Sequence, residues 1–316
     1  MKKKSLAFAA VICVMLFGAL FYRNLWENKG FERTEFLFDT QCTVKAYGDN
    51  AQKAVEAVFD RLYEIHRATD FFSEDSQVAT INNAAQGEAV IVEPHVQNII
   101  TAALDVSKAS LGAFDITVAP VVSLWDFSGE GRVPKETEIS DALAYTGIDK
   151  ISFDEKNKVR KAFKEVKIDL GGAAKGYAAD EAIRVLTEYG VLGAIVDLGG
   201  NISCMGQNPN TKDGKWRIGL QKPFSATGEY DEIIEIESGA VVTSGTYQRY
   251  FEKDGKKYHH IIDPKTGHPA EREYSSVTIV AQNSLYADCL ATACFVMGEE
   301  DGRALAENFG AEIYFK

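Results

Sequence analysis

The sequence predicts an α+β fold, in which mixed or antiparallel sheets pack against helices. Segments with helical spacing and segments with strand-like alternation do not alternate regularly, as they would in a doubly wound α/β protein. Several short strand-like segments follow one another in the second half with no helix between them. The chain has 316 residues, 46% of them apolar, which is enough for one large domain or two small ones with a substantial core.

The first half combines strands with three helices. Phe36–Tyr47 alternates in polarity, which predicts a strand. Apolar residues at helical spacing predict a helix over Ala51–Ala68. Further helices are expected at Pro94–Ser110 and Pro134–Tyr145, and further strands at Lys150–Phe153 and Glu165–Leu170.

The second half contains two helices and most of the strands. A helix is expected over Ala173–Tyr189, because Gly190 follows it as a stop signal. Gly298 ends a second helix, Tyr286–Met297, in the same way. The strand-like segments are Ala194–Leu198, Trp216–Gln221, Ile233–Ile236, Ala240–Ser244, Lys257–Ile262 and Ser276–Val280.

The N-terminus is expected to be a targeting segment. Lys2–Lys4 precede Leu6–Tyr22, a run of 17 residues without a charge. This length lies between a signal-peptide core of about 7–15 residues and a spanning helix of roughly 17–25. We favour a retained membrane anchor at residues 1–23 over a cleaved signal or a lipoprotein signal at Cys13. In each case the body is expected on the extracytoplasmic side of the cell membrane. Residues 24–34 are expected to be a linker, and residues 35–316 the folded domain.

The charge of the body is acidic. The chain carries a net charge of −12, although its first 23 residues hold four basic side chains and no acidic one. Such a body repels phosphate backbones, so we expect no nucleic-acid partner. An anionic ligand would need a local device, such as a metal ion or backbone N–H groups.

A glycine turn between a strand and a helix is the first candidate ligand site. Ile168–Tyr177 reads IDLGGAAKGY, where glycines let the backbone approach a ligand and the helix N-terminus favours an anion. Lys175 lies in the first helical turn, where a base opposes the helix dipole, and this favours a phosphate or carboxylate beside it. The alternative is a tight connection with a solvated lysine. The spacing matches neither GxGxxG nor the Walker A motif.

Two oxygen-bearing side chains share one face of the Tyr286–Met297 helix. Asp288 and Thr292 are four residues apart, and the rest of the helix is small or apolar. A buried carboxylate is costly unless it is paired or bound to metal, and these oxygens suit Mg²⁺ with water and phosphate. Alternatively, Asp288 caps the helix N-terminus and Thr292 bonds to its own helix backbone.

Two adjacent histidines, His259 and His260, run into an Asp-Pro-Lys-Thr-Gly turn. Strand alternation points one of them inward, where it can act as a general base, although a structural pair is equally compatible. Aromatic residues in Gly112–Thr117 and Leu124–Phe127 can sandwich a flat ring or pack in the core. Thr243–Tyr250 is a ligand edge or a simple hairpin.

In this order, these segments resemble the ApbE-type FAD:protein FMN transferases over Phe36–Met297. The most specific segments are IDLGGAAKGYAAD, HHIIDPKTG and YADCLATACFVMG, supported by GAFDITVAPVVSLWDF, FFSEDSQVATIN and VVTSGTYQRY. The resemblance implies an ApbE-like, T-fold-related structure. It also implies transfer of FMN from FAD to a Thr or Ser hydroxyl of an exported or membrane flavoprotein of an electron-transfer chain, with AMP leaving and Mg²⁺ on the pyrophosphate.

The resemblance also implies roles for individual residues. Asp288, Thr292 and a backbone carbonyl near Gly172 would be metal ligands, and His260 the base that activates the acceptor hydroxyl. The residues expected to contact FAD are Phe38, Ala113, Phe114, Asp115, Asp169, Lys175 and Ile262. Two other functions keep the same site: an FAD pyrophosphatase, in which water replaces the acceptor, and a carrier that holds FAD without turnover.

The sequence departs from the family pattern at three places. The family's Met-Gly-Thr is Phe38-Asp39-Thr40 here, its Trp-Gly-Phe is Trp125-Asp126-Phe127, and its Ser-Gly-Asp is Ser244-Gly245-Thr246. Phe38 can still cover an aromatic ring. Asp39 and Asp126 add negative charge, which bears on the flavin contacts more than on the metal site.

Overall fold

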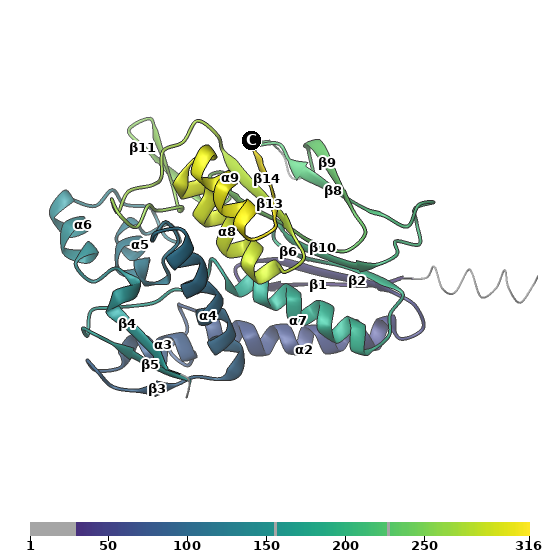
Figure 1. Ribbon diagram of the computed structural model, residues 1–316, viewed down its shortest axis with the longest axis horizontal. Helices are drawn as coiled ribbons and strands as arrows, with labels where there is room; N and C mark the ends of the chain where they lie inside the picture. Colours follow the sequence, from purple (N-terminus) through teal and green to yellow (C-terminus); the bar gives the residue numbers. More distant parts are fainter. Residues whose placement is uncertain (1–29, 155–156, 226–227) are drawn as a thin grey trace, which may run out of the picture.

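The computed structural model describes residues 30–154, 157–225 and 228–316 (Figure 1). The expected anchor or signal at residues 1–23 lies outside this part of the chain. Among the described helices, none is long and apolar enough to cross a membrane.

One antiparallel sheet of seven strands organises the molecule and confirms the predicted α+β class. Its strand order is β1-β2-β6-β7-β10-β13-β14, and every neighbouring pair is antiparallel. The strands are β1 (Gly30–Leu37), β2 (Thr40–Tyr47), β6 (Gly193–Leu198), β7 (Asn201–Gly206), β10 (Gly239–Gly245), β13 (Ser276–Ala281) and β14 (Glu312–Phe315).

The two faces of this sheet are buried by different partners. Successive side chains of a strand alternate between the two faces of a sheet. In β10, Val242 therefore belongs to the hydrophobic core under the helices, and Val241 belongs to the core on the opposite face. The helices that pack against the sheet are α2 (Ala51–Thr69), α7 (Ala174–Glu188) and α8 (Ser284–Met297), joined by α4 (Pro94–Ala109) and α9 (Glu299–Asn308). The other face packs against the hairpin of β8 (Trp216–Gln221) and β9 (Tyr230–Ile236) (Figure 1).

Smaller elements gather beside the N-terminal half of this core. Figure 1 shows α5, α6 and the small β3–β5–β4 sheet at the end of the molecule away from the β8–β9 hairpin. These elements are α3 (Gln77–Asn83), β3 (Val90–Ile91), η1 (Ile116–Val118), α5 (Ala119–Trp125), α6 (Glu136–Leu143), η2 (Ile148–Lys150), β4 (Ile151–Asp154) and β5 (Lys158–Lys161). The hairpin of β11 (Tyr250–Lys253) and β12 (Lys256–His259) completes the list.

The N-terminal strand prediction was wrong in two respects. The expected strand Phe36–Tyr47 is not one strand. It covers the end of β1, a turn at Phe38 and Asp39, and all of β2. Both residues have left-handed φ angles, 52° and 58°. A glycine at either position would have indicated the turn in the sequence, whereas Phe and Asp do not. Strand β1 also begins at Gly30, inside the expected linker of residues 24–34, because its backbone pairs with β2 as far as Tyr47.

Two other strand predictions also need correction. Glu165–Leu170 is not a strand, because the backbone of Ile168 is hydrogen-bonded to the side chain of Asn82 and not to a neighbouring strand. Asn82 Oδ1 accepts the Ile168 N–H at 2.8 Å, and Asn82 Nδ2 donates to the Ile168 carbonyl at 3.0 Å. The expected strand Lys257–Ile262 ends at His259, beyond which His260 donates its N–H to the Arg249 carbonyl.

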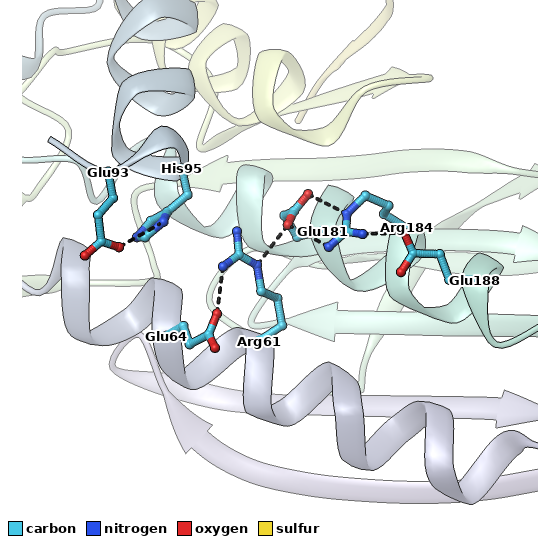
Figure 2. Close-up of polar contacts among 7 residues, drawn as sticks. All are labelled: Arg61, Glu64, Glu93, His95, Glu181, Arg184 and Glu188. Atoms are coloured by element: carbon cyan, nitrogen blue, oxygen red, sulfur yellow. Dashed lines mark hydrogen bonds and ion pairs between the residues drawn. The ribbon is translucent and has the colours of Figure 1, made fainter. Parts of the chain in front are cut away.

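A charged network ties α2 to α7 (Figure 2). The Arg61 guanidinium of α2 lies between Glu64 and Glu181, at 2.8 Å from each carboxylate. Arg184 donates to the same Glu181 at 3.0 Å. Since Glu181 belongs to α7, the network holds α7 against α2. The glycine turn Gly171–Gly172 comes directly before α7.

The N-terminus of α8 is held by side chains from other elements. The two carboxylate oxygens of Asp180, on α7, accept the N–H groups of Ser284 and Leu285 at 2.8 and 2.9 Å. The Ser284 hydroxyl donates to Asn201 Oδ1 on β7 at 2.7 Å. At Gly176, an added Cβ would lie 2.4 Å from the Ser284 carbonyl oxygen, so only glycine allows α7 and α8 to approach this closely.

Replacing Asp180 by Ala is expected to destabilise the protein by about 2–4 kcal/mol, because two buried N–H groups lose their acceptors. Asp180→Asn keeps one acceptor oxygen and should lose about half as much. Urea unfolding of the two variants and the wild type measures the difference. Equal unfolding midpoints for all three proteins would show that water satisfies these N–H groups.

Candidate functional site

A cavity of about 1010 Å³ opens beside the α7–α8 contact. Its walls come from the β1–β2 turn, the segment around Phe114, the glycine turn Gly171–Gly172, the end of β10 and the segment after β12. The inward face of α8 closes one side. Segments from the whole length of the described chain therefore meet at one site.

Every residue that the sequence predicts for the site lines this one cavity. The structure brings together Phe38, Ala113, Phe114, Asp115, Asp169, Gly172, Lys175, His260, Ile262, Asp288 and Thr292. Their individual roles stay predictions, because the structure shows where they lie and not what they bind. Asp39 and Asp126, which depart from the family pattern, line the cavity too.

The cavity is strongly acidic. Of the described side chains that line it, eight are carboxylates and two are Lys or Arg, namely Lys175 and Arg249. The carboxylates are Asp39, Asp70, Asp115, Asp126, Asp169, Asp197, Glu229 and Asp288. An anionic ligand bound here would be repelled unless a metal ion, the two cations or backbone N–H groups compensated.

Asp288 and Thr292 lie on the face of α8 that borders the cavity. Asp288 is only 4% exposed, and its Oδ2 accepts the Gly176 N–H at 2.9 Å. Burial raises the pKa of Asp288, and the nearby Lys175 opposes that rise. Thr292 Oγ1 lies 3.1 Å from Ser244 Oγ. An added Cβ on Gly172 would be 3.9 Å from Thr292 Oγ1, so the glycine turn lies beside these oxygens.

Asn201 is a polar residue of this corner that the sequence did not single out. It is 1% exposed and lines the cavity. Its amide lies beside the Asp288 carboxylate and acts to lower the pKa of that group, although Nδ2 makes no hydrogen bond of ordinary geometry to the described residues. Asn201 therefore adds a buried amide to the polar surface of this corner. The only signal in the sequence was the Gly199-Gly200-Asn201 turn after a strand.

The donor set at this corner is poor in classical metal ligands. Across residues 30–154, 157–225 and 228–316, no three His, Cys, Asp or Glu side chains group to hold a metal ion. The oxygens present are one carboxylate, hydroxyls and main-chain carbonyls. This set suits a hard cation that keeps water and takes phosphate oxygens as further ligands.

The glycine turn places a cation and a carboxylate at the cavity wall. Lys175 Nζ donates to the Gly171 carbonyl at 3.3 Å, and Asp169 Oδ1 accepts the Gly171 N–H at 2.8 Å. Burial raises the pKa of Asp169, while Arg249 and Lys175 act to lower it. Asp115 caps the following 3-10 turn by accepting the Thr117 N–H at 2.7 Å and the Thr117 hydroxyl at 2.6 Å.

His260 lines the cavity, whereas His259 lines a separate small pocket. Both the N–H and the Nδ1 of His260 lie within hydrogen-bond distance of the Arg249 carbonyl, at 3.1 and 3.2 Å. When Nδ1–H donates to that carbonyl, Nε2 keeps its lone pair. Burial, followed by the charge of Arg249, lowers the pKa of His260 to about 3, so the ring is neutral at pH 7.

The aromatic residues divide between the cavity and the core. Trp125 is 1% exposed, and its Nε1 donates to the Gly267 carbonyl at 2.9 Å, so it is a core residue. Phe114 packs against Gly172, with its ring 3.0 Å from the position of an added Cβ. Phe38 and Phe127 also line the cavity, so flat aromatic surfaces are available on more than one wall.

Comparison with known proteins gives a consistent result. A family model described as the ApbE family matches residues 38–315. The FAD:protein FMN transferase of Vibrio cholerae serotype O1 is 36% identical over 81% of this chain and 77% of its own. The FAD:protein FMN transferase of Treponema pallidum is 33% identical over 90% of this chain and 84% of its own.

Solved structures give the same picture. The ApbE protein of Thermotoga maritima superposes with a TM-score of 0.81 at 37% identity, covering 91% of this chain and 94% of that one. The flavin transferase ApbE from Vibrio cholerae also has a TM-score of 0.81, at 30% identity, and covers 91% and 93% of the two chains.

Proposed function

Because this chain belongs to the ApbE family, we propose that it is an FAD:protein FMN transferase that moves FMN to a Thr or Ser hydroxyl of an acceptor protein. The observation that carries the proposal is the convergence of Asp288, Thr292 and the glycine turn with His260 on one cavity. A phosphate-binding corner and a neutral imidazole are the two parts that phosphoryl transfer to a hydroxyl requires.

Mg²⁺ fits the corner formed by α8 and the glycine turn. Asp288 would supply the charged ligand, Thr292 a hydroxyl and Gly172 a main-chain carbonyl, with water and phosphate completing the shell. The buried Asn201 amide beside Asp288 keeps this corner polar. When bound, Mg²⁺ would offset the negative charge of the diphosphate, which eight surrounding carboxylates would otherwise repel.

The protein's own residues orient the substrate and move one proton. Lys175, at the glycine turn, would hold the diphosphate, while Phe38 and Phe114 offer apolar faces to the isoalloxazine ring. The acceptor hydroxyl oxygen bonds to the FMN phosphorus, and the bond from that phosphorus to the bridging oxygen breaks. His260 Nε2 takes the hydroxyl proton, and the bridging oxygen leaves as part of AMP.

We also propose an acceptor on the outer side of the cell membrane, such as an exported or membrane flavoprotein of an electron-transfer chain. The support is the uncharged run Leu6–Tyr22 behind three lysines, which favours a membrane-anchored enzyme with its body outside the cytoplasm. Fractionation of cells, followed by protease treatment of intact spheroplasts, tests this location.

Intact-mass analysis tests the proposed activity. The full-length protein is incubated with FAD, Mg²⁺ and a candidate acceptor, and AMP is quantified in parallel. We expect the acceptor to gain the mass of one FMN for each AMP released. AMP and free FMN with an unmodified acceptor would instead identify an FAD pyrophosphatase, and bound FAD without AMP would identify a carrier.

A further inference from the structure

Asp39 and Arg249 form an ion pair at the cavity wall, although they come from segments far apart in the sequence. Asp39 is the second residue of the β1–β2 turn, and Arg249 lies between β10 and β11. Arg249 Nη2 is 3.6 Å from Asp39 Oδ2, and both side chains line the cavity. The family pattern that this chain resembles has Gly in place of Asp39, so the ion pair depends on a residue that departs from that pattern.

The turn that carries Asp39 is held by strand pairing and by a ring contact to α2. Only Phe38 and Asp39 separate the paired residues Leu37 and Thr40, and both adopt left-handed φ angles as in a tight hairpin turn. The Phe38 ring also meets the His66 ring of α2 edge-on, with 5.2 Å between ring centroids. The carboxylate of Asp39 is therefore anchored to the main sheet and to α2.

The segment that carries Arg249 holds the proposed base. The Arg249 carbonyl lies 3.1 Å from the main-chain nitrogen of His260 and 3.2 Å from its Nδ1, so one oxygen can accept both N–H groups. The turn before Arg249 is held through Gln248, whose Nε2 donates to the Thr243 carbonyl at 3.1 Å. A movement of the Arg249 main chain would therefore carry the imidazole with it.

We infer that Asp39 and Arg249 are positioning residues for His260: their ion pair ties the Arg249 main chain, and with it the imidazole, to the β1–β2 hairpin turn. The inference rests on the proposed function, in which His260 takes the proton of the acceptor hydroxyl. The Arg249 and Asp39 side chains are 44% and 58% exposed, and pairs as exposed as this one contribute little to stability. Losing the pair should therefore alter catalysis more than unfolding.

A purely electrostatic role for Asp39 makes a different prediction. Arg249 and Lys175 are the two Lys or Arg side chains that the described part of the chain contributes to an acidic cavity. If Asp39 only neutralised Arg249, removing its charge would strengthen FAD binding and leave the rate at saturation unchanged. The separation of kcat from KM therefore distinguishes the two roles.

The test compares Asp39→Asn, Arg249→Gln, the double variant and the charge-swapped pair Asp39→Arg/Arg249→Asp. We expect each single change to lower kcat for FMN transfer about three- to tenfold, and the double variant to be no slower than the slower single one. The charge-swapped pair should recover part of the loss. Thermal unfolding midpoints should match the wild type, because the pair is exposed.

Additive losses in the double variant, or an unchanged kcat with a lower KM for FAD in Asp39→Asn, would overturn the inference. The outcome is separable from that of the proposed function. If the wild type releases AMP without modifying the acceptor, transfer is disproved, but the same four variants still report on His260 through the rate of AMP release, since attacking water needs the same base.

Discussion

Replacing Asp288 by Asn is expected to slow FMN transfer by about a thousandfold, because Mg²⁺ binding loses its one carboxylate ligand and charge stabilisation by a metal amounts to several kcal/mol. The variant should still fold. The amide oxygen of Asn can accept the Gly176 N–H that Asp288 Oδ2 accepts now at 2.9 Å. AMP release measured against Mg²⁺ concentration, with calorimetric Mg²⁺ titration, gives both parts of the result.

Thr292 supplies a matched control on the same helix face. Thr292→Ser keeps the hydroxyl that lies 3.1 Å from Ser244 Oγ and should remain close to wild-type activity. Thr292→Val has nearly the same shape without the hydroxyl and should need more Mg²⁺. If Asp288→Asn worked at the same Mg²⁺ concentration as the wild type, α8 would carry no metal ligand and Asp288 would be structural.

Replacing His260 by Ala is expected to slow transfer about 10²–10⁴-fold, the usual contribution of a general base. Binding of FAD should change little, since the glycine turn and the α8 corner hold the diphosphate in the proposed mechanism. Burial disfavours the charged imidazolium and lowers the pKa of His260 to about 3. The base is therefore neutral throughout pH 5–8, and single-turnover transfer should not fall as pH drops from 8 to 5.

His259 is the control for this experiment, because its ring points away from the cavity. It contacts the ring of Phe295 edge-on, with 5.7 Å between centroids, and lines the small pocket. His259→Gln should transfer FMN at nearly the wild-type rate. If the His259 variant transferred FMN slowly and the His260 variant transferred it at the wild-type rate, His259 and not His260 would be the base. A wild-type rate that drops tenfold between pH 7 and pH 5.5 would show that His260 titrates like an exposed histidine.

The sequence predicted the longer helices because each carried either apolar residues at helical spacing or a clear start or stop signal. Apolar spacing located α2, and Gly298 marked the end of α8. The β1–β2 turn escaped prediction since Phe38 and Asp39 take left-handed angles without glycine. The segment Glu165–Leu170 has strand-like residues, but its backbone partner is a side chain, which no local pattern reveals.

For the site, the motifs and the family resemblance named eleven residues that line one cavity, but not the residues that support them. The roles of the eleven stay predictions. Asp180, Asn201 and Arg249 were missed as supports. Asp180 contacts a partner 104 residues away, and Asn201 one 83 residues away. The low pKa of His260 arises from burial by such distant segments, so an isolated histidine motif does not reveal it.

The contact at Gly176 has a mechanical consequence. Because the backbones of α7 and α8 touch there with no side chain between them, neither helix can tilt or slide without colliding with the other. The two helices therefore form one closely packed pair, which carries Asp288 and Thr292 and follows directly after the glycine turn. The contact between the hairpin turn and Arg249, by contrast, is an exposed ion pair, so this part of the cavity wall can yield at lower cost than the α7–α8 pair.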